Sequence, residues 1–159
     1  LVRIAAHAVE DRKSTRLTGV QTCAVRIFYR VSEDPRYSHT FETGPEFQVL
    51  DNDGHSDGVT EAHRAGANYA LHAPSRDVTR PVGEWNTVRI VADSARVEHW
   101  LNGQRIVEYE LGSEDWERRV AGSKFAAWPQ YGRAPRGHIG LQEHGSFVAF
   151  RNVRIRELR

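Results

Sequence analysis

The sequence predicts an all-β domain, built as an antiparallel β-sandwich or jelly roll with one short helix. Segments rich in β-branched and aromatic residues follow one another at short spacing from residue 27 onward. An Asn102-Gly103 pair joins two of them, and this dipeptide is the strongest short-range hairpin signal because both turn positions require positive φ. Short strands joined by hairpins are typical of sandwiches and jelly rolls.

The predicted strands alternate between apolar and polar residues where one face is buried. In the segment 46–50, Glu46 and Gln48 lie on the face opposite the apolar residues. In the last strand the apolar positions change phase, which predicts a bulge or twist near Arg151-Asn152. The segments predicted as strands are 27–32, 46–50, 68–72, 85–92, 96–101, 104–109, 137–142 and 148–158.

One helix is predicted near residues 114–121. Ser113 is placed to cap its first turn, and Glu114 and Asp115 follow where the positive end of the helix dipole favours acidic side chains. The polar segment 51–65 is expected to be a long loop, and loops of that length are usually functional or disordered.

The composition fits one globular domain and excludes several classes of function. The chain has 159 residues, of which 39% are hydrophobic and 27% are charged. Its 22 basic and 21 acidic residues leave a formal charge of +1, so no bulk field attracts nucleic acid or a membrane surface. No apolar run is long enough to span a bilayer, and a single cysteine excludes an internal disulfide framework.

Residues 1–26 do not share the β pattern of the rest of the chain. The segments 14–17 (Ser-Thr-Arg-Leu) and 21–24 (Gln-Thr-Cys-Ala) can be encoded by complementary codons, and residues 11–26 resemble a translated sequencing adapter. We therefore expect residues 1–26 to be a non-native or disordered segment and residues 27–159 to form the β-sandwich domain. On this interpretation Cys23 has no functional role.

Several motifs occur together and in one order over about residues 27–158. They are Gly44-Pro-Glu-Phe-Gln-Val-Leu-Asp-Asn52, Gly83-Glu-Trp-Asn-Thr-Val-Arg-Ile90, Glu98-His-Trp-Leu-Asn-Gly103, Ser123-Lys-Phe125, Gly137-His-Ile-Gly-Leu-Gln-Glu-His-Gly145 and Phe150-Arg-Asn-Val-Arg-Ile-Arg156. With this set the chain resembles the 3-keto-disaccharide hydrolase domain family. The resemblance implies a concanavalin A-like fold and an action on glycosides oxidised at C3 of the sugar.

The resemblance also implies that the domain is truncated at its N-terminus. Family members carry further strands ahead of the segment that corresponds to residues 27–32. Without them, apolar strand faces and sheet edges would be left open, so we expect this chain itself to be aggregation-prone and inactive. The parent protein is expected to be periplasmic or secreted.

The implied reaction is the hydrolysis of 3-keto-glycosides, with an oligosaccharide or glycoside as the substrate. A ketone at C3 acidifies the C2 proton, so a base can remove it, the C1 substituent can leave by elimination, and water then adds. This route needs a base, an acid for the leaving oxygen and an electrophile that holds the enolate, but no redox cofactor. A divalent metal as that electrophile stays open. A noncatalytic carbohydrate-binding module is the alternative from a different class of function.

Three residues form the candidate catalytic core. His144 ranks first as the base, because the ordinary pKa of histidine already lies near neutral pH. Glu46 is the candidate acid or base, and Lys124, in the loop after the helix, is the candidate that holds an enolate or a sugar oxygen. The alternative for each is an ordinary solvated side chain.

The candidate substrate-binding residues lie on the same strands and loops. Asp51 and His55 belong to an acidic loop, where turn capping or the binding of a hard cation are the alternatives. Trp128 either stacks on a sugar ring or anchors packing. The full set is Arg30, Gln48, Asp51, His55, Trp128 and Gln142. His99, in phase with its apolar neighbours, is instead predicted to be a hydrogen-bonded, partly buried histidine.

Overall fold

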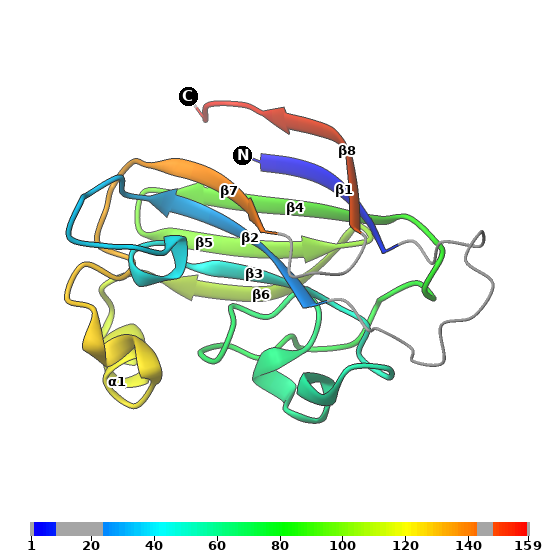
Figure 1. Cartoon of the computed structure of the whole chain (residues 1–159), viewed down its shortest axis with the longest axis horizontal. Helices are drawn as coiled ribbons and strands as arrows, with labels where there is room; N and C mark the ends of the chain where they lie inside the picture. Colours follow the sequence, from blue (N-terminus) through cyan, green and yellow to red (C-terminus); the bar gives the residue numbers. More distant parts are fainter. Residues whose placement is uncertain (1, 9–23, 143–147, 159) are drawn as a thin grey trace.

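A computed structural model describes residues 2–8, 24–142 and 148–158 as two antiparallel sheets packed face to face (Figure 1). The larger sheet has the order β6-β5-β4-β1-β8 and the smaller sheet the order β3-β2-β7. The strands are β1 (Val2–Ala8), β2 (Ala24–Val31), β3 (Glu46–Leu50), β4 (Asn86–Asp93), β5 (Arg96–Leu101), β6 (Gln104–Glu110), β7 (His138–Gln142) and β8 (Val148–Ile155). The single α-helix of the described residues is α1 (Glu114–Ala121), and the short 3₁₀ turns are η1 (Thr40–Glu42), η2 (Ser56–Val59), η3 (Glu61–His63) and η4 (Lys124–Ala127).

The predicted all-β sandwich with one short helix is confirmed. Strand β3 and helix α1 have the predicted bounds, and the Ser113 side chain accepts a hydrogen bond from the backbone N–H of Trp116. Asn102 and Gly103 both have positive φ, at 49° and 83°, as the hairpin between β5 and β6 requires. None of the helices in the described ranges is long and apolar enough to cross a bilayer.

Two local predictions have different outcomes. The bulge near residues 151–152 is confirmed, because Asn152 has a φ of 55° and the pairing of β8 with β1 shifts register there. The strand expected at 68–72 is wrong. Asn68 makes isolated bridges to Phe47 and His72, and the chain turns at Ala70, whose φ is 60°.

The N-terminal part of the chain contributes to both sheets. Strand β1 lies between β4 and β8, and β2 begins at Ala24, three residues ahead of the expected domain start. Val25 is fully buried. Residues 9–23, which hold most of the adapter-like segment, lie outside the described residues, so its non-native origin stays a prediction.

The core lies between the two sheets and includes the side chain of His99. Ile27 and Phe47 of the smaller sheet face Val88 and Ile90 of the larger one. His99 is fully buried, with Nδ1 2.9 Å from the Gly66 carbonyl and Nε2 2.8 Å from the Tyr29 hydroxyl. Because a carbonyl only accepts, Nδ1 donates to it and Nε2 accepts from Tyr29. The predicted hydrogen bonding of His99 is confirmed, and its burial is complete rather than partial.

A stack of aromatic rings fixes the helix against the sandwich. The ring of Trp116 in α1 stacks on Tyr109 of β6 at 5.3 Å and on Tyr131 at 5.8 Å, and Tyr131 stacks on Phe125 at 4.0 Å. Phe125 belongs to η4, directly after Lys124. The stack therefore sets the position of the turn that carries Lys124.

Replacing His99 with Gln is expected to remove an acid-sensitive part of the stability. Burial lowers the pKa of His99 to about 4, from an unfolded value near 6.5. Between these two pH values the unfolded state binds a proton that the folded state does not bind, so the free energy of unfolding falls as the pH falls. Relative to His99→Gln, the wild-type free energy of unfolding should fall by about 2–3 kcal/mol from pH 7 to pH 4.5. Urea titrations of both proteins measure this difference. A difference that does not change with pH would contradict the buried neutral state.

Candidate active site

The face of the smaller sheet that points away from the core carries a cluster of polar side chains. Arg26 on the central strand β2 is paired with Gln48 of β3 on one side and with Gln142 of β7 on the other. Directly paired residues point to the same face of a sheet, and Glu46 lies two residues from Gln48 on that face. We call this surface the site face.

Glu46 is a buried carboxyl paired with a guanidinium. Its side chain is only 1% exposed, and Oε2 lies 2.7 Å from Nε of Arg26. Burial raises the pKa of Glu46 to about 7, although the charges of Arg26 and Lys124 act in the opposite direction. Near neutral pH this carboxyl therefore exchanges its proton readily, which is what a general acid or base requires.

The ring of Tyr69 joins the polar groups of the site. The guanidinium of Arg26 lies 4.5 Å and the ammonium of Lys124 lies 4.6 Å from the ring centroid, and the imidazole of His63 stacks on the ring at 4.4 Å. The backbone N–H of Tyr69 donates to the carbonyl of Glu46, which fixes the ring beside β3. Two cations, an imidazole and a buried carboxyl thus meet around one aromatic side chain.

Lys124 lies among aromatic rings at the edge of the cluster. Its ammonium is 5.0 Å from the ring of Phe125 and 5.4 Å from that of Phe41. Desolvation by these neighbours lowers the pKa of Lys124, while Glu46 raises it. Trp128 continues this rim, with its ring edge-on to Phe41 at 5.3 Å. A cation beside partly buried aromatic rings suits the binding of an oxyanion on a sugar.

The structure brings four of the predicted site residues together and places a fifth beside them. Glu46, Gln48 and Gln142 share the site face, and the Arg26 guanidinium donates to Gln142 Oε1 at 3.2 Å. Lys124 reaches the cluster from η4. Trp128 lies on the aromatic rim. The amide atoms of Gln48 are buried, and within the described residues they have no hydrogen-bond partner.

Three predicted binding residues lie away from this cluster, and one lies outside the described residues. The Arg30 guanidinium donates to the carbonyl of Ser94 at 2.5 Å. Asp51 accepts from the backbone N–H groups of residues 53 and 54, and His55 Nδ1 accepts from that of residue 57. These contacts match the turn-capping alternative for the acidic loop. His144 is outside the described residues, so its role as the base stays a prediction.

Three residues of the site were not expected from the sequence. Arg26 fell in the segment set apart as non-native, although its apolar neighbours Val25 and Ile27 give it the alternation of a half-buried strand. His63 lies in the long loop and Tyr69 in the turn after it, and no local pattern links them to β3. A metal cluster is not formed, because no group of three or more His, Cys, Asp or Glu side chains converges in the described parts of the chain.

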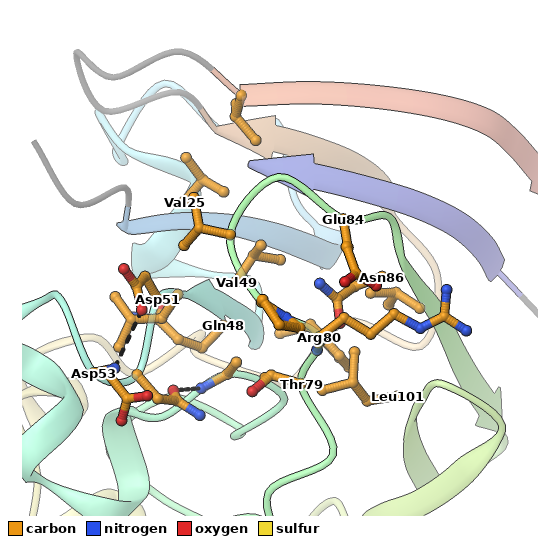
Figure 2. A pocket seen from close by; sticks show the side chains of 18 residues that line it. Val25, Gln48, Val49, Asp51, Asp53, Thr79, Arg80, Glu84, Asn86 and Leu101 are labelled. Atoms are coloured by element: carbon orange, nitrogen blue, oxygen red, sulfur yellow. Dashed lines mark hydrogen bonds between the residues drawn. The ribbon is translucent and has the colours of Figure 1, made fainter. Parts of the chain in front are cut away.

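A cavity of about 320 Å³ lies elsewhere, between the two sheets (Figure 2). Its lining is mixed: Val25, Val49 and Leu101 are apolar, while Asp51 and Arg80 contribute polar groups. Arg26, Glu46 and Lys124 do not line it. Val49 and Glu46 belong to opposite faces of β3, but Gln48 of the site face also lines the cavity, so the two features adjoin at this residue.

The comparison with protein families identifies the chain. Residues 18–156 match the model of the 3-keto-alpha-glucoside-1,2-lyase-like domain. The chain belongs to this family. A curated relative, a 3-keto-disaccharide hydrolase of Bacteroides thetaiotaomicron, is 33% identical over 129 residues, which are 73% of this chain and 44% of the relative. The chain therefore spans less than half the length of that relative.

Solved structures share the fold of this family member. A crystal structure from Parabacteroides distasonis, provisionally named a glycosyl hydrolase, has a TM-score of 0.80 and 33% identity over 96% of this chain and 66% of its own. A second one from the same organism has a TM-score of 0.70 and 21% identity, covering 99% of this chain and 77% of its own. The second likeness is one of fold alone.

Replacing Glu46 with Gln is expected to stabilise the protein more as the pH rises. The pKa of Glu46 is about 7 in the folded state and near 4.5 in the unfolded state, so between pH 4.5 and pH 7 the folded state binds more protons. The free energy of unfolding of the wild type therefore falls as the pH rises through this range. Relative to wild type, the unfolding free energy of Glu46→Gln should rise by about 2 kcal/mol from pH 5 to pH 8. Denaturant titrations at both pH values measure it. A relative fall would mean that the ion pair with Arg26 outweighs burial.

Proposed function

We propose that this domain cleaves 3-keto-glycosides at the site face. The observation that carries the proposal is the convergence of a buried carboxyl, Glu46, and an ammonium, Lys124, around Tyr69. One group is suited to hold a proton near neutral pH and the other to hold a negative oxygen. These are two of the three functions that elimination from a 3-keto-sugar requires.

The proposed reaction proceeds by elimination and hydration. A base removes the C2 proton, and the electron pair of the C2–H bond forms an enolate whose oxygen is on C3. The enolate then collapses, the C1–C2 double bond forms, and the C1–O bond breaks as the leaving oxygen takes a proton from the acid. Water adds its oxygen to C1 and a proton returns to C2, so the net products are the 3-keto-sugar and the free alcohol.

The residues of the site face have distinct roles in this scheme. Glu46, whose burial raises its pKa to about 7, is the acid for the leaving oxygen. Lys124 holds the enolate oxygen. The amide of Gln48, buried and unpartnered within the described residues, is suited to bind a sugar hydroxyl, since native proteins rarely leave such a group unsatisfied. Because Glu46 is only 1% exposed, a ligand reaches its carboxyl after a neighbouring side chain moves aside.

The names of the similar proteins support the substrate class. The family is named for a lyase of 3-keto-alpha-glucosides and the Bacteroides relative for a hydrolase of 3-keto-disaccharides. The two names differ in whether water is added after elimination. Both are consistent with a first step at C2 of a sugar oxidised at C3.

A carbohydrate-binding module without activity is the second candidate function. The rings of His39, Phe41 and Trp128 favour it, because His39 stacks on Phe41 at 5.0 Å and Trp128 meets Phe41 edge-on. Aromatic side chains of this kind bind sugars without any chemistry. The two functions differ in whether bound sugar is turned over.

Incubation with a panel of 3-keto-disaccharides, with and without a chelator, tests the proposal. We expect cleavage of the oxidised sugars only, and kcat lowered about 10²-fold or more by Glu46→Gln and by Lys124→Met. In the wild type, kcat should fall as the pH rises above about 7, because the acid then loses its proton. Product analysis by NMR measures the turnover.

The unoxidised disaccharides and the Bacteroides relative are the controls. Binding without cleavage by both proteins would overturn the proposal in favour of a carbohydrate-binding module. Cleavage by the relative but not by this chain would assign the activity to the longer protein only. Full activity of Glu46→Gln would remove Glu46 from the mechanism.

A further inference from the structure

A carboxylate and an imidazole of the long loop form a pair beside the site face. Nδ1 of His63, the last residue of η3, is 3.9 Å from Oδ1 of Asp57 in η2. Asp57 is itself held in place, because its Oδ2 accepts from the Tyr69 hydroxyl at 3.4 Å and its backbone N–H donates to Nδ1 of His55. The imidazole of His63 stacks on the Tyr69 ring with only 20° between the planes.

This pair differs from Glu46 in its access to solvent. The side chain of His63 is 26% exposed, whereas that of Glu46 is 1% exposed. At 3.9 Å the Asp57 carboxylate acts on Nδ1 of His63 through its charge and not through a hydrogen bond, while stacking on Tyr69 holds the plane of the ring. Nε2 is then the nitrogen that exchanges a proton with a substrate. His63 therefore offers an oriented and reachable base next to Lys124, which shares the Tyr69 ring with it.

We propose that His63, paired with Asp57, is the base that removes the C2 proton of a 3-keto-glycoside. The inference rests on the function proposed above. It assigns the base, for which the described residues named so far offer no group. The C2–H bond breaks, the proton passes to Nε2 of His63, and the electron pair forms the enolate that Lys124 holds. When water adds at C1, His63 returns the proton to C2, and the proton of the water restores Glu46.

Burial and two nearby cations keep His63 in the neutral form that a base requires. Burial lowers its pKa, Asp57 raises it, and the cations Lys124 and Arg26 lower it. The net effect lowers the pKa of His63 and so favours the neutral imidazole. The groups that face it are Asp57 from η2, Tyr69 from the turn before His72, Lys124 from η4 and Arg26 from β2.

Deuterium exchange at C2 isolates this step from the departure of the alcohol. The chain is incubated in D₂O with methyl 3-keto-α-glucoside, and NMR follows C2 deuteration and methanol release. We expect His63→Asn to lower the exchange about 10²-fold or more, and Asp57→Asn to lower it less and to shift the acidic limb of its pH profile to lower pH. His138→Asn, a 66% exposed histidine at the start of β7, is the matched control and should keep the wild-type rate.

The outcomes separate this inference from the proposed function. Exchange and cleavage by wild type that persist in His63→Asn but are lost in His144→Asn would overturn the role of His63 and leave the proposed function intact. A wild-type chain that neither exchanges nor cleaves would overturn both for this chain. The pairing itself is measured without turnover: Asp57→Asn should lower the pKa of His63 in an NMR titration and Asp53→Asn should not. An unchanged pKa in Asp57→Asn would overturn the pairing.

Discussion

The burial of Glu46 beside Arg26 is the interaction on which the site depends. Removal from water favours the protonated carboxyl, whereas a guanidinium at 2.7 Å favours the carboxylate. Burial prevails, and the pKa rises to about 7. A carboxyl on the open surface would be ionised at this pH and useless as an acid, and one buried without cations would hold its proton too strongly. The ion pair thus sets the carboxyl between these limits.

The aromatic stack connects the hydrophobic core to the turn that carries Lys124. Tyr109 of β6 stacks on Trp116 of α1, which stacks on Tyr131, and Tyr131 stacks on Phe125 next to Lys124. Rings packed in this way resist displacement, because moving one opens a void beside the next. The helix therefore contributes to the site through this stack. It holds the turn from which the ammonium approaches the ring of Tyr69.

Local patterns predicted what depends on neighbours in the sequence. Alternation placed Glu46 and Gln48 on one face, and capping and hairpin signals located α1 and the Asn102-Gly103 turn. Contacts between distant segments could not be predicted in this way, which is why the meeting of Arg26 and Lys124 at the ring of Tyr69 was missed. Arg30 shows a further limit. Its φ of 54° and the register shift between Phe28 and Val31 break the alternation of β2, so its side chain reaches Ser94 rather than the site.

The register between β2 and β3 links the stability of the domain to its chemistry. Phe47 contributes to the core between the sheets, while Glu46 and Gln48 form the site face, and all three belong to one strand. A slip of one residue would exchange the two faces, exposing the apolar residues and burying the acid among them. Arg26 is the third residue of β2 and so lies near the N-terminal end of that strand. A change in the position of the first residues of β2 would therefore move the Arg26 guanidinium, which sets the pKa of Glu46, and would also alter the packing of the sheet.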